Sequence, residues 1–194
     1  ARQRVELGQK QLQAHMNPQF IFNCLSTIQQ FVAANDRANA NRYLADFALL
    51  MRQTLDNSRD EVISLQREIE YLTNYISFWE VRFPQRFTWS VVCAPEVDPY
   101  TAQIPAMVVQ PFVENALKHA VATATGKGGV LSVLFYEKDD RLWCRIEDDG
   151  PGIEIAGARN RRPQKGFELT RRRLAHTARR WGGNYTLNII SKAQ

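Results

Sequence analysis

Apolar positions recur at helical spacing near the start of the chain. Within residues 12–32, four apolar side chains are separated by four, three and four positions, and this period predicts a helix with one apolar face. The members of that face are Ile21, Leu25, Ile28 and Val32.

Two further helices are expected before residue 84. Asn35–Asp36 supplies a cap for a helix over 41–57, and Ser64 caps the next helix. The apolar positions of the later helix alternate between spacings of four and three, which is typical of a coiled-coil seam and predicts a helical partner. The stripe of the helix 41–57 is Leu44, Phe47, Met51 and Leu55, and the later stripe is Leu65, Ile69, Leu72, Ile76, Trp79 and Phe83.

Beyond Pro84 the pattern changes to short β-branched and aromatic runs, which predict strands. The chain is therefore predicted to be α+β, with a helical region over 1–86 followed by an α/β sandwich over 87–194. The expected strands are 87–93, 130–136, 142–147 and 185–190, the expected helices are 108–121 and 166–181, and the expected loops are 95–105 and 150–165.

An Asn-Pro pair interrupts the first helical pattern. Pro18 lacks a backbone donor and disfavours helix at Asn17, so the helix is expected to start or kink at this point. The break is followed directly by polar and aromatic residues, and this corner is therefore a candidate site. Those residues are Gln19, Phe20, Phe22 and Asn23.

A polar cluster is expected on the helix 108–121. Asn115, Lys118 and His119 share one face at spacings of three and four, and Glu114 precedes them. An amide oxygen suits a divalent cation and the cations suit phosphate groups, so this cluster fits a polyphosphate with its Mg2+. By itself, the cluster is better explained by a solvated helix face with an ordinary histidine.

A second motif ends the strand 142–147. Asp148 at the end of a buried strand can accept a hydrogen bond from an amino group such as that of adenine. Gly150 and Gly152 permit a turn and a close backbone approach to a ligand. A simple acidic turn is the alternative, but the presence of both motifs in this order favours a ligand site.

Composition places the chain among ordinary globular proteins. Its 194 residues are 44% hydrophobic and 23% charged, and the net charge of +5 permits an anionic partner without naming one. The count of three cysteines, spaced far apart without a metal-binding pattern, indicates buried cytosolic thiols. The basic residues crowd a C-terminal region that includes Arg159, Arg161, Arg162, Lys165, Arg171, Arg172, Arg173, Arg179 and Arg180.

Four segments resemble those of known protein families. The frame Asn17-Pro18-x-Phe20-Ile21-Phe22-Asn23 resembles the phospho-acceptor box of the LytS/YehU-like sensor histidine kinases, and residues 70–83 resemble the later part of that domain. The run 114–119 resembles the N box of the GHKL ATPase fold, and Asp148-x-Gly150-x-Gly152 resembles its G1 box. Together these matches cover nearly the whole chain.

The resemblance implies a fold, cofactors and partners. It implies a helical dimerisation region and a GHKL (Bergerat) ATP-binding domain, in which Asn115 holds Mg2+ and Asp148 reads adenine. Glu114 is then a candidate catalytic residue, while Lys118 and His119 are candidates for binding the nucleotide. The second glycine box falls at Gly166, where Glu168 replaces a glycine common in the family. The implied partners are a second copy of the chain and a response-regulator receiver domain.

One residue departs from the acceptor box. The family has a phosphorylated histidine where this sequence has Gln19. An amide nitrogen shares its lone pair with the carbonyl group and should not accept phosphate, so no autophosphorylation is predicted at this position. Three explanations stay open: a laboratory substitution, a natural pseudokinase that binds ATP, and, ranked last, transfer of the acceptor role to His15.

The arginine-rich C-terminal region raises a different class of function, binding of nucleic acid. The arginine-rich region is compatible with a GHKL ATPase that acts on nucleic acid, but aromatic interleaving is poor and no DNA-binding motif is present, so no nucleic-acid partner is expected. The chain opens on Ala1-Arg2-Gln3-Arg4. This opening is expected of an excised fragment, and the resemblance to sensor kinases implies a cytoplasmic fragment of a protein anchored in the bacterial inner membrane.

Overall fold

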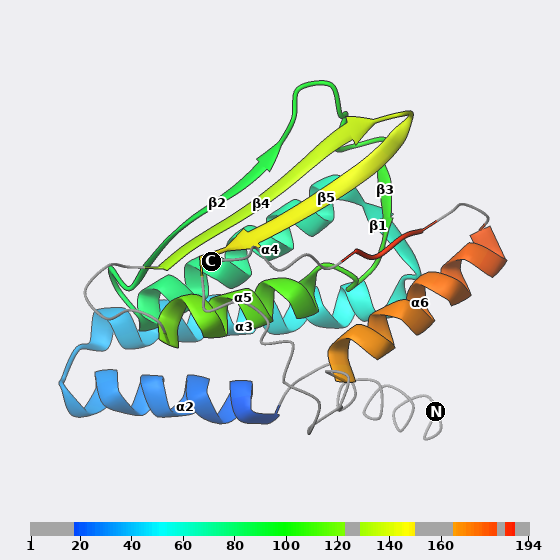
Figure 1. The fold of residues 1–194 in the computed structure, drawn as a ribbon. Coiled ribbons are helices and arrows are strands. Elements are labelled where there is room, and N and C mark those ends of the chain that lie inside the picture. Colours follow the sequence, from blue (N-terminus) through cyan, green and yellow to red (C-terminus); the bar gives the residue numbers. More distant parts are fainter. Residues whose placement is uncertain (1–17, 123–128, 150–164, 182–184, 189–194) are drawn as a thin grey trace, which may run out of the picture. The chain divides into compact units, whose positions relative to one another are not determined.

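The structure is a computed structural model. It describes residues 18–122, 129–149, 165–181 and 185–188. This part of the chain is α+β, with five helices and a mixed sheet (Figure 1). The chain divides into two compact units, Ala1–Glu61 and Val62–Gln194, and each is considered by itself.

The described residues of the first unit form an antiparallel pair of helices, α2 (Pro18–Ala33) and α3 (Arg37–Arg59). Asn35, at φ 57°, ends α2, and the N–H of Asp36 donates to the Phe31 carbonyl at 2.9 Å. This is the left-handed end that closes many helices. Asp36 then caps α3 by accepting a hydrogen bond from the Asn39 N–H at 3.1 Å, which confirms the predicted cap.

The buried faces of α2 and α3 differ from the predicted stripes. In α2 the buried residues are Cys24 and Thr27, whereas Leu25 and Val32 are exposed. In α3 the predicted Leu44 is 50% exposed and Tyr43 is fully buried. The edge-to-face contact of Phe31 with Tyr43, at 5.9 Å between ring centroids, shows which sides of the two helices meet.

The described residues of the second unit form two small sheets and three helices. In the three-stranded sheet β2 pairs with β4 in parallel and β4 pairs with β5 antiparallel, while β1 and β3 form a separate antiparallel pair. The elements are β1 (Val62–Ser64), α4 (Leu65–Arg82), β2 (Phe87–Cys93), β3 (Gln103–Pro105), α5 (Gln110–Ala122), β4 (Gly129–Lys138), β5 (Arg141–Asp148) and α6 (Lys165–Trp181).

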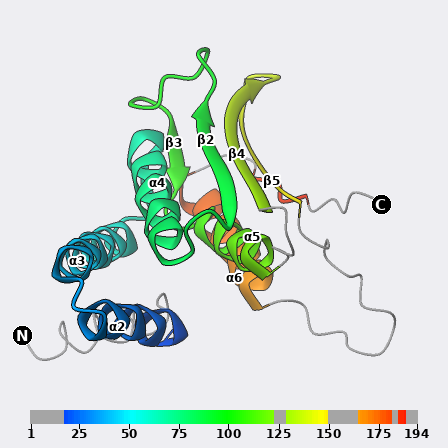
Figure 2. The ribbon, with the colours of Figure 1, turned by 90° about the vertical axis from the view of Figure 1, so that its left-hand side faces the viewer.

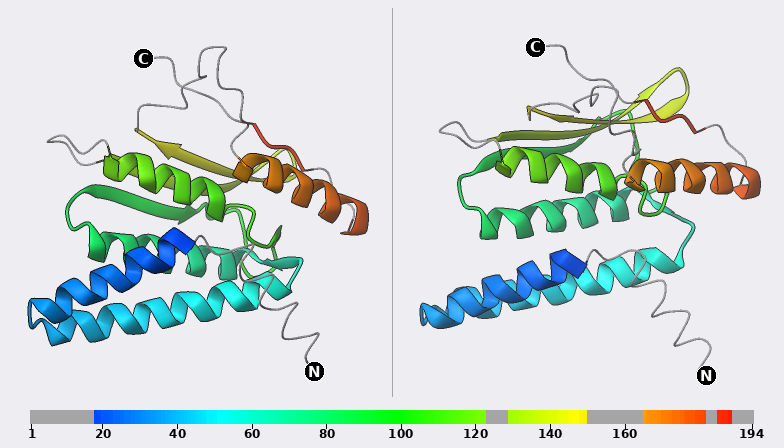
Figure 3. Two further views of the ribbon diagram at one scale, coloured as in Figure 1. Left: turned by 90° about the horizontal axis from the view of Figure 1, so that it is seen from below. Right: turned by 60° about the horizontal axis from the view of Figure 1, so that its bottom comes forward.

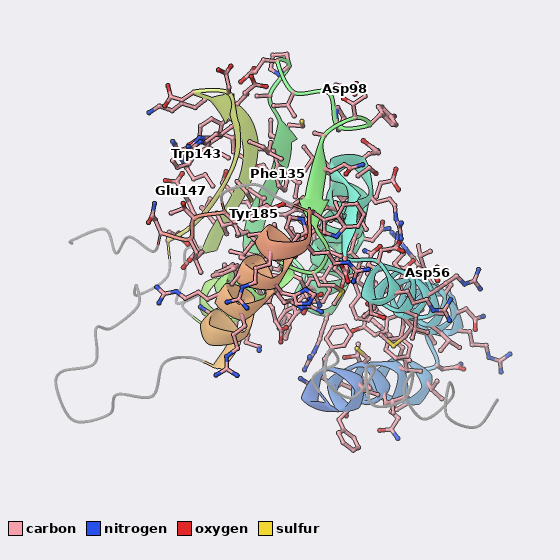
Figure 4. All side chains as sticks on the ribbon, turned by 90° about the vertical axis from the view of Figure 1, so that its right-hand side faces the viewer. Asp56, Asp98, Phe135, Trp143, Glu147 and Tyr185 are labelled. Carbon is pink, nitrogen blue, oxygen red and sulfur yellow. The ribbon has the colours of Figure 1, made fainter. Side chains whose placement is uncertain are left out.

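Helices cover one face of the three-stranded sheet. α4 packs against β2, α5 packs against β4 and β5, and α6 lies beside α5 (Figures 2 and 3). Alternate residues of β4 therefore point into the core, and Leu131, Val133 and Phe135 have no exposed surface. Trp143 and Glu147 of β5 are paired with β4 residues of the opposite parity and lie on the outer face (Figure 4).

Helix α4 begins as predicted but packs differently. Ser64 caps it by accepting a hydrogen bond from the Arg67 N–H at 3.3 Å. Helix α5 is a helical partner of α4 within the second unit, but α4 also packs on β1 and β2, so the predicted coiled-coil seam describes only part of its packing. Tyr71, Tyr75 and Phe78 are buried beside the predicted stripe, so the buried surface is wider than a seam. The compact units divide after Glu61, before α4, and the domain boundary expected at 86 stays a prediction.

Several predicted strands are confirmed, and some are not. β2, β4 and β5 lie where expected, and Asp139 and Asp140, both at φ 54°, form the turn between β4 and β5. The pairing of β1 with β3 was missed because each strand has three residues and no alternating pattern. Residues 185–188 form no strand, and most of the predicted loop 150–165 lies outside the described residues.

Candidate functional site

Helix α5 presents the predicted polar residues. Glu114 and Asn115 are half-buried, and Lys118 is exposed. The Lys118 ammonium group lies 2.7 Å from a Glu114 carboxylate oxygen. A pair this exposed contributes only a few tenths of a kcal/mol to stability, so its main effect is to fix both side chains on one side of α5. His119 lies in α5, but its side chain is outside the described part.

Asp148 ends β5 on the side of the sheet that faces the helices. Its partner in the strand pairing is Leu131, which is fully buried in the core, and directly opposed residues point to the same face of a sheet. The next residue, Asp149, holds the strand end, because its carboxylate accepts a hydrogen bond from the Val130 N–H at 2.6 Å. Since α5 packs against β5, Asp148 and the α5 cluster belong to adjoining elements.

The remaining predicted site residues are only partly described. Gln19 lies in the first turn of α2, and Gly166 lies in the first turn of α6. The structure describes only the backbone at both positions. His15, Gly150 and Gly152 lie outside the described residues, so their proposed roles stay predictions.

The turn that leads into α5 is held from α6. Arg173 donates through Nη1 to the carbonyl oxygens of Ala106 at 3.3 Å and Met107 at 3.5 Å. Met107 has a φ of 60°, which is unfavourable for a residue with a side chain. Burial lowers the pKa of Arg173. At least one arginine of the C-terminal cluster therefore has an internal structural contact.

Glu68 is a buried acid at the start of α4. It lies in the first turn of α4 and is 1% exposed. Its carboxylate accepts a hydrogen bond from the Val109 N–H, but burial outweighs that bond and raises the pKa of Glu68 to about 7. Glu68 follows the cap residue Ser64 by four positions, which is too general a signal to identify a buried acid.

The donor set fits a nucleotide and Mg2+. Asn115 offers an amide oxygen, which is a suitable Mg2+ ligand, and Lys118 offers a cation for phosphate. Asp148 offers an acceptor for an amino group. Within the described ranges, no group of three or more His, Cys, Asp and Glu side chains forms a metal-binding cluster.

Comparison with known proteins identifies the family. The family model described as "Histidine kinase" matches residues 7–87. Sensor protein LytS of Staphylococcus epidermidis is 33% identical over 144 residues, which is 74% of this chain and 24% of that protein. The chain belongs to the LytS/YehU-like family of sensor histidine kinases.

Other relatives support the same assignment. Sensor protein LytS of Oceanobacillus iheyensis is 30% identical over 151 residues, covering 77% of this chain and 25% of that protein. Sensor histidine kinase YpdA of Escherichia coli is 29% identical over 143 residues, covering 74% and 24%. The chain therefore spans about a quarter of the length of these relatives.

Among the helices that are described, none is long and apolar enough to cross a membrane.

Proposed function

We propose that this chain is the kinase core of a two-component sensor, and that its second unit binds Mg-ATP. The observation that carries the proposal is the packing of α5, with Glu114, Asn115 and Lys118, against the strand that ends at Asp148. Membership of the histidine kinase family supports the proposed use of ATP.

The roles of the residues follow from their chemistry. Asn115 would hold Mg2+ through its amide oxygen, and the ion would neutralise charge on the phosphates when bound. Lys118 would contact phosphate, and Asp148 would accept a hydrogen bond from the adenine amino group. Glu114, bonded to Lys118 at 2.7 Å, would position that ammonium group. Phosphoryl transfer of this kind depends on positioning and charge neutralisation.

Position 19 decides whether transfer follows binding. A neutral imidazole offers a nucleophilic lone pair, whereas the amide of Gln19 does not. With Gln19 in place, the chain is expected to bind nucleotide without autophosphorylation at this position. With histidine there, the phosphoryl group would be available for transfer to a response-regulator receiver domain.

Binding of Mg-ATP is the direct test. Titration calorimetry of the full chain with Mg-ATP should show saturable binding, and Asp148→Asn should weaken it at least tenfold, because a neutral amide oxygen is a weaker acceptor for the adenine amino group than a carboxylate and the amide NH2 cannot accept at all. Asp139→Asn, in the turn after β4, is the matched control and should bind like the parent chain. Binding that is absent at millimolar Mg-ATP, or unaffected by Asp148→Asn, would contradict the proposal.

A further inference from the structure

Helix α5 begins without a cap from its own sequence. The carbonyl of Val109 accepts the first helical hydrogen bonds, from the N–H groups of Phe112 at 3.0 Å and Val113 at 3.3 Å. Val109 is therefore the N-cap residue, and it has no side-chain oxygen. The first turn contains no acidic residue, so neither a capping side chain nor a capping box is available locally.

Glu68 supplies the missing acceptor from another helix. Its carboxylate accepts a hydrogen bond from the Val109 N–H, which is the contact that the acidic residue of a capping box makes within one helix. Glu68 is also in the first turn of α4. A negative charge at this point interacts favourably with the positive ends of both helices.

The same segment is fixed on its other side by Arg173. The turn 106–109 is thus held between α4 and α6, and one of its residues, Met107, has an unfavourable backbone conformation. Backbone of this kind persists only where its surroundings determine it. The start of α5, and with it the position of Asn115, depends on these two contacts.

We propose that Glu68 is a positioning residue that caps α5 from α4, and that its ionised carboxylate increases the affinity of the α5 site for Mg-nucleotide. The affinity part rests on the proposed function. The connection is direct in the chain, because α4 follows the first unit after the short strand Val62–Ser64. A change at the start of α4 would thereby reach the helix that carries Asn115.

The ionisation of Glu68 falls in an accessible pH range. Burial raises its pKa to about 7, and the Val109 hydrogen bond opposes that rise. One carboxylate oxygen, Oε1, is buried without a hydrogen-bond partner among the described residues. A proton on Oε1 would therefore find no acceptor to donate to. The ionised carboxylate accepts a stronger hydrogen bond from the Val109 N–H than the neutral carboxyl group does.

Few other titratable groups face Glu68. The Cys144 thiol of β5 interacts with it electrostatically, but burial chiefly raises the pKa of Cys144 to about 12, so the thiol stays neutral. Of the elements packed on α4, β1 and β3 carry no titratable side chain, and β2 carries Cys93. α5 carries Glu114, Lys118 and His119.

Hydrogen exchange tests the capping role without nucleotide. In the full chain, Glu68→Ala should accelerate exchange of the amides in 109–113 about fivefold, which corresponds to the loss of roughly 1 kcal/mol of capping. Glu68→Gln keeps an oxygen acceptor and should restore most of the protection. Glu70→Gln, an exposed acid on the same helix that bonds to Gln66 at 2.8 Å, is the control. Equal exchange in Glu68→Ala and the control would overturn the capping role.

Affinity as a function of pH tests the role of the charge. The measured quantity is the affinity of the parent chain for Mg-ADP divided by that of Glu68→Gln. This ratio should be up to about tenfold higher at pH 8 than at pH 6, because the fraction of ionised Glu68 rises through this range. The ratio to Glu68→Gln cancels the titration of the nucleotide itself. Parallel profiles for the parent chain and Glu68→Gln would overturn the affinity claim. Loss of binding in every variant, with the exchange difference retained, would instead overturn the proposed function and leave the cap established.

Discussion

A single acid shows how burial changes the chemistry of a residue. Glu68 and Glu70 are two positions apart on α4, yet Glu68 is 1% exposed and Glu70 lies on the exposed side of the helix. Burial favours the neutral carboxyl form. The pKa of Glu68 rises from an ordinary value of 4.5 to about 7, so its charge changes near neutral pH.

This shift predicts how stability depends on pH. The raised pKa contributes stability that is complete below pH 4.5 and is lost as the pH rises to about 7. The free energy of unfolding of Glu68→Gln, minus that of the parent chain, should therefore increase by roughly 3 kcal/mol between pH 4.5 and pH 8. Urea unfolding at both pH values measures the difference. A constant difference would show that Glu68 ionises in the folded chain as it does in the unfolded one.

Position 19 carries a second prediction at this scale. Replacement of Gln19 by histidine should allow labelling of the chain by γ-labelled ATP, because an imidazole lone pair is then available. The parent chain and Gln19→Ala should remain unlabelled. Nucleotide binding by Gln19→His without label would favour a pseudokinase. Label on the parent chain that disappears in His15→Ala would assign the acceptor role to His15.

At the scale of elements, the hairpin of α2 and α3 depends on its connection. Asn35 at φ 57° reverses the chain, and Asp36 both completes the end of α2 and caps α3. Asp36 accepts bonds from the Asn39 N–H and from the Asn39 side-chain amide, at 3.1 Å and 2.6 Å. A short connection held in this way fixes two antiparallel helices beside each other.

Removal of this cap should destabilise the hairpin. Asp36→Ala is expected to lower the free energy of unfolding by about 1 kcal/mol, because the Asn39 N–H loses its acceptor. Asp56→Ala is the control, since Asp56 is an exposed acid near the other end of α3 that pairs with Arg59 at 3.8 Å. Thermal or urea unfolding followed by circular dichroism measures both. An equal effect of the two substitutions would contradict the capping argument.

At the scale of the whole molecule, α2 has an apolar surface suited to association. Phe22, Leu25 and Val32 are 66%, 47% and 64% exposed. Their spacing of three and seven positions places them along one side of the helix. Exposed apolar residues that form a stripe commonly mark an interface, and the helical pattern favours a second copy of the chain as the partner.

A homodimer formed through this stripe should dissociate when charge is placed in it. The double substitution Leu25→Asp and Val32→Asp should convert a dimer to a monomer in light scattering, because two carboxylates would otherwise be buried in the interface. Gln30→Asp lies at an exposed position on another side of α2, outside the stripe, and should leave the dimer intact. A parent chain that is monomeric at high concentration would contradict the prediction.

Much of the fold could be predicted from local sequence. Ser64 and Asp36 mark helix starts because their side-chain oxygens bond backbone N–H groups a few residues away. The strands 87–93, 130–136 and 142–147 were found because their β-branched and aromatic residues favour extended chain. The motifs at Asn115 and Asp148 also identified two elements that prove to adjoin each other. All of these signals act over a few residues.

Only the tertiary structure decided which surfaces are buried and which distant residues meet. The stripe of α2 is exposed at Leu25 and Val32, because Cys24 and Thr27 lie on the buried side instead. The strand pair β1 and β3, and the contact of Glu68 with Val109, join segments far apart in the chain. A sequence determines local periodicity and capping through short-range contacts. The burial of a carboxyl group depends on neighbours that only folding brings together.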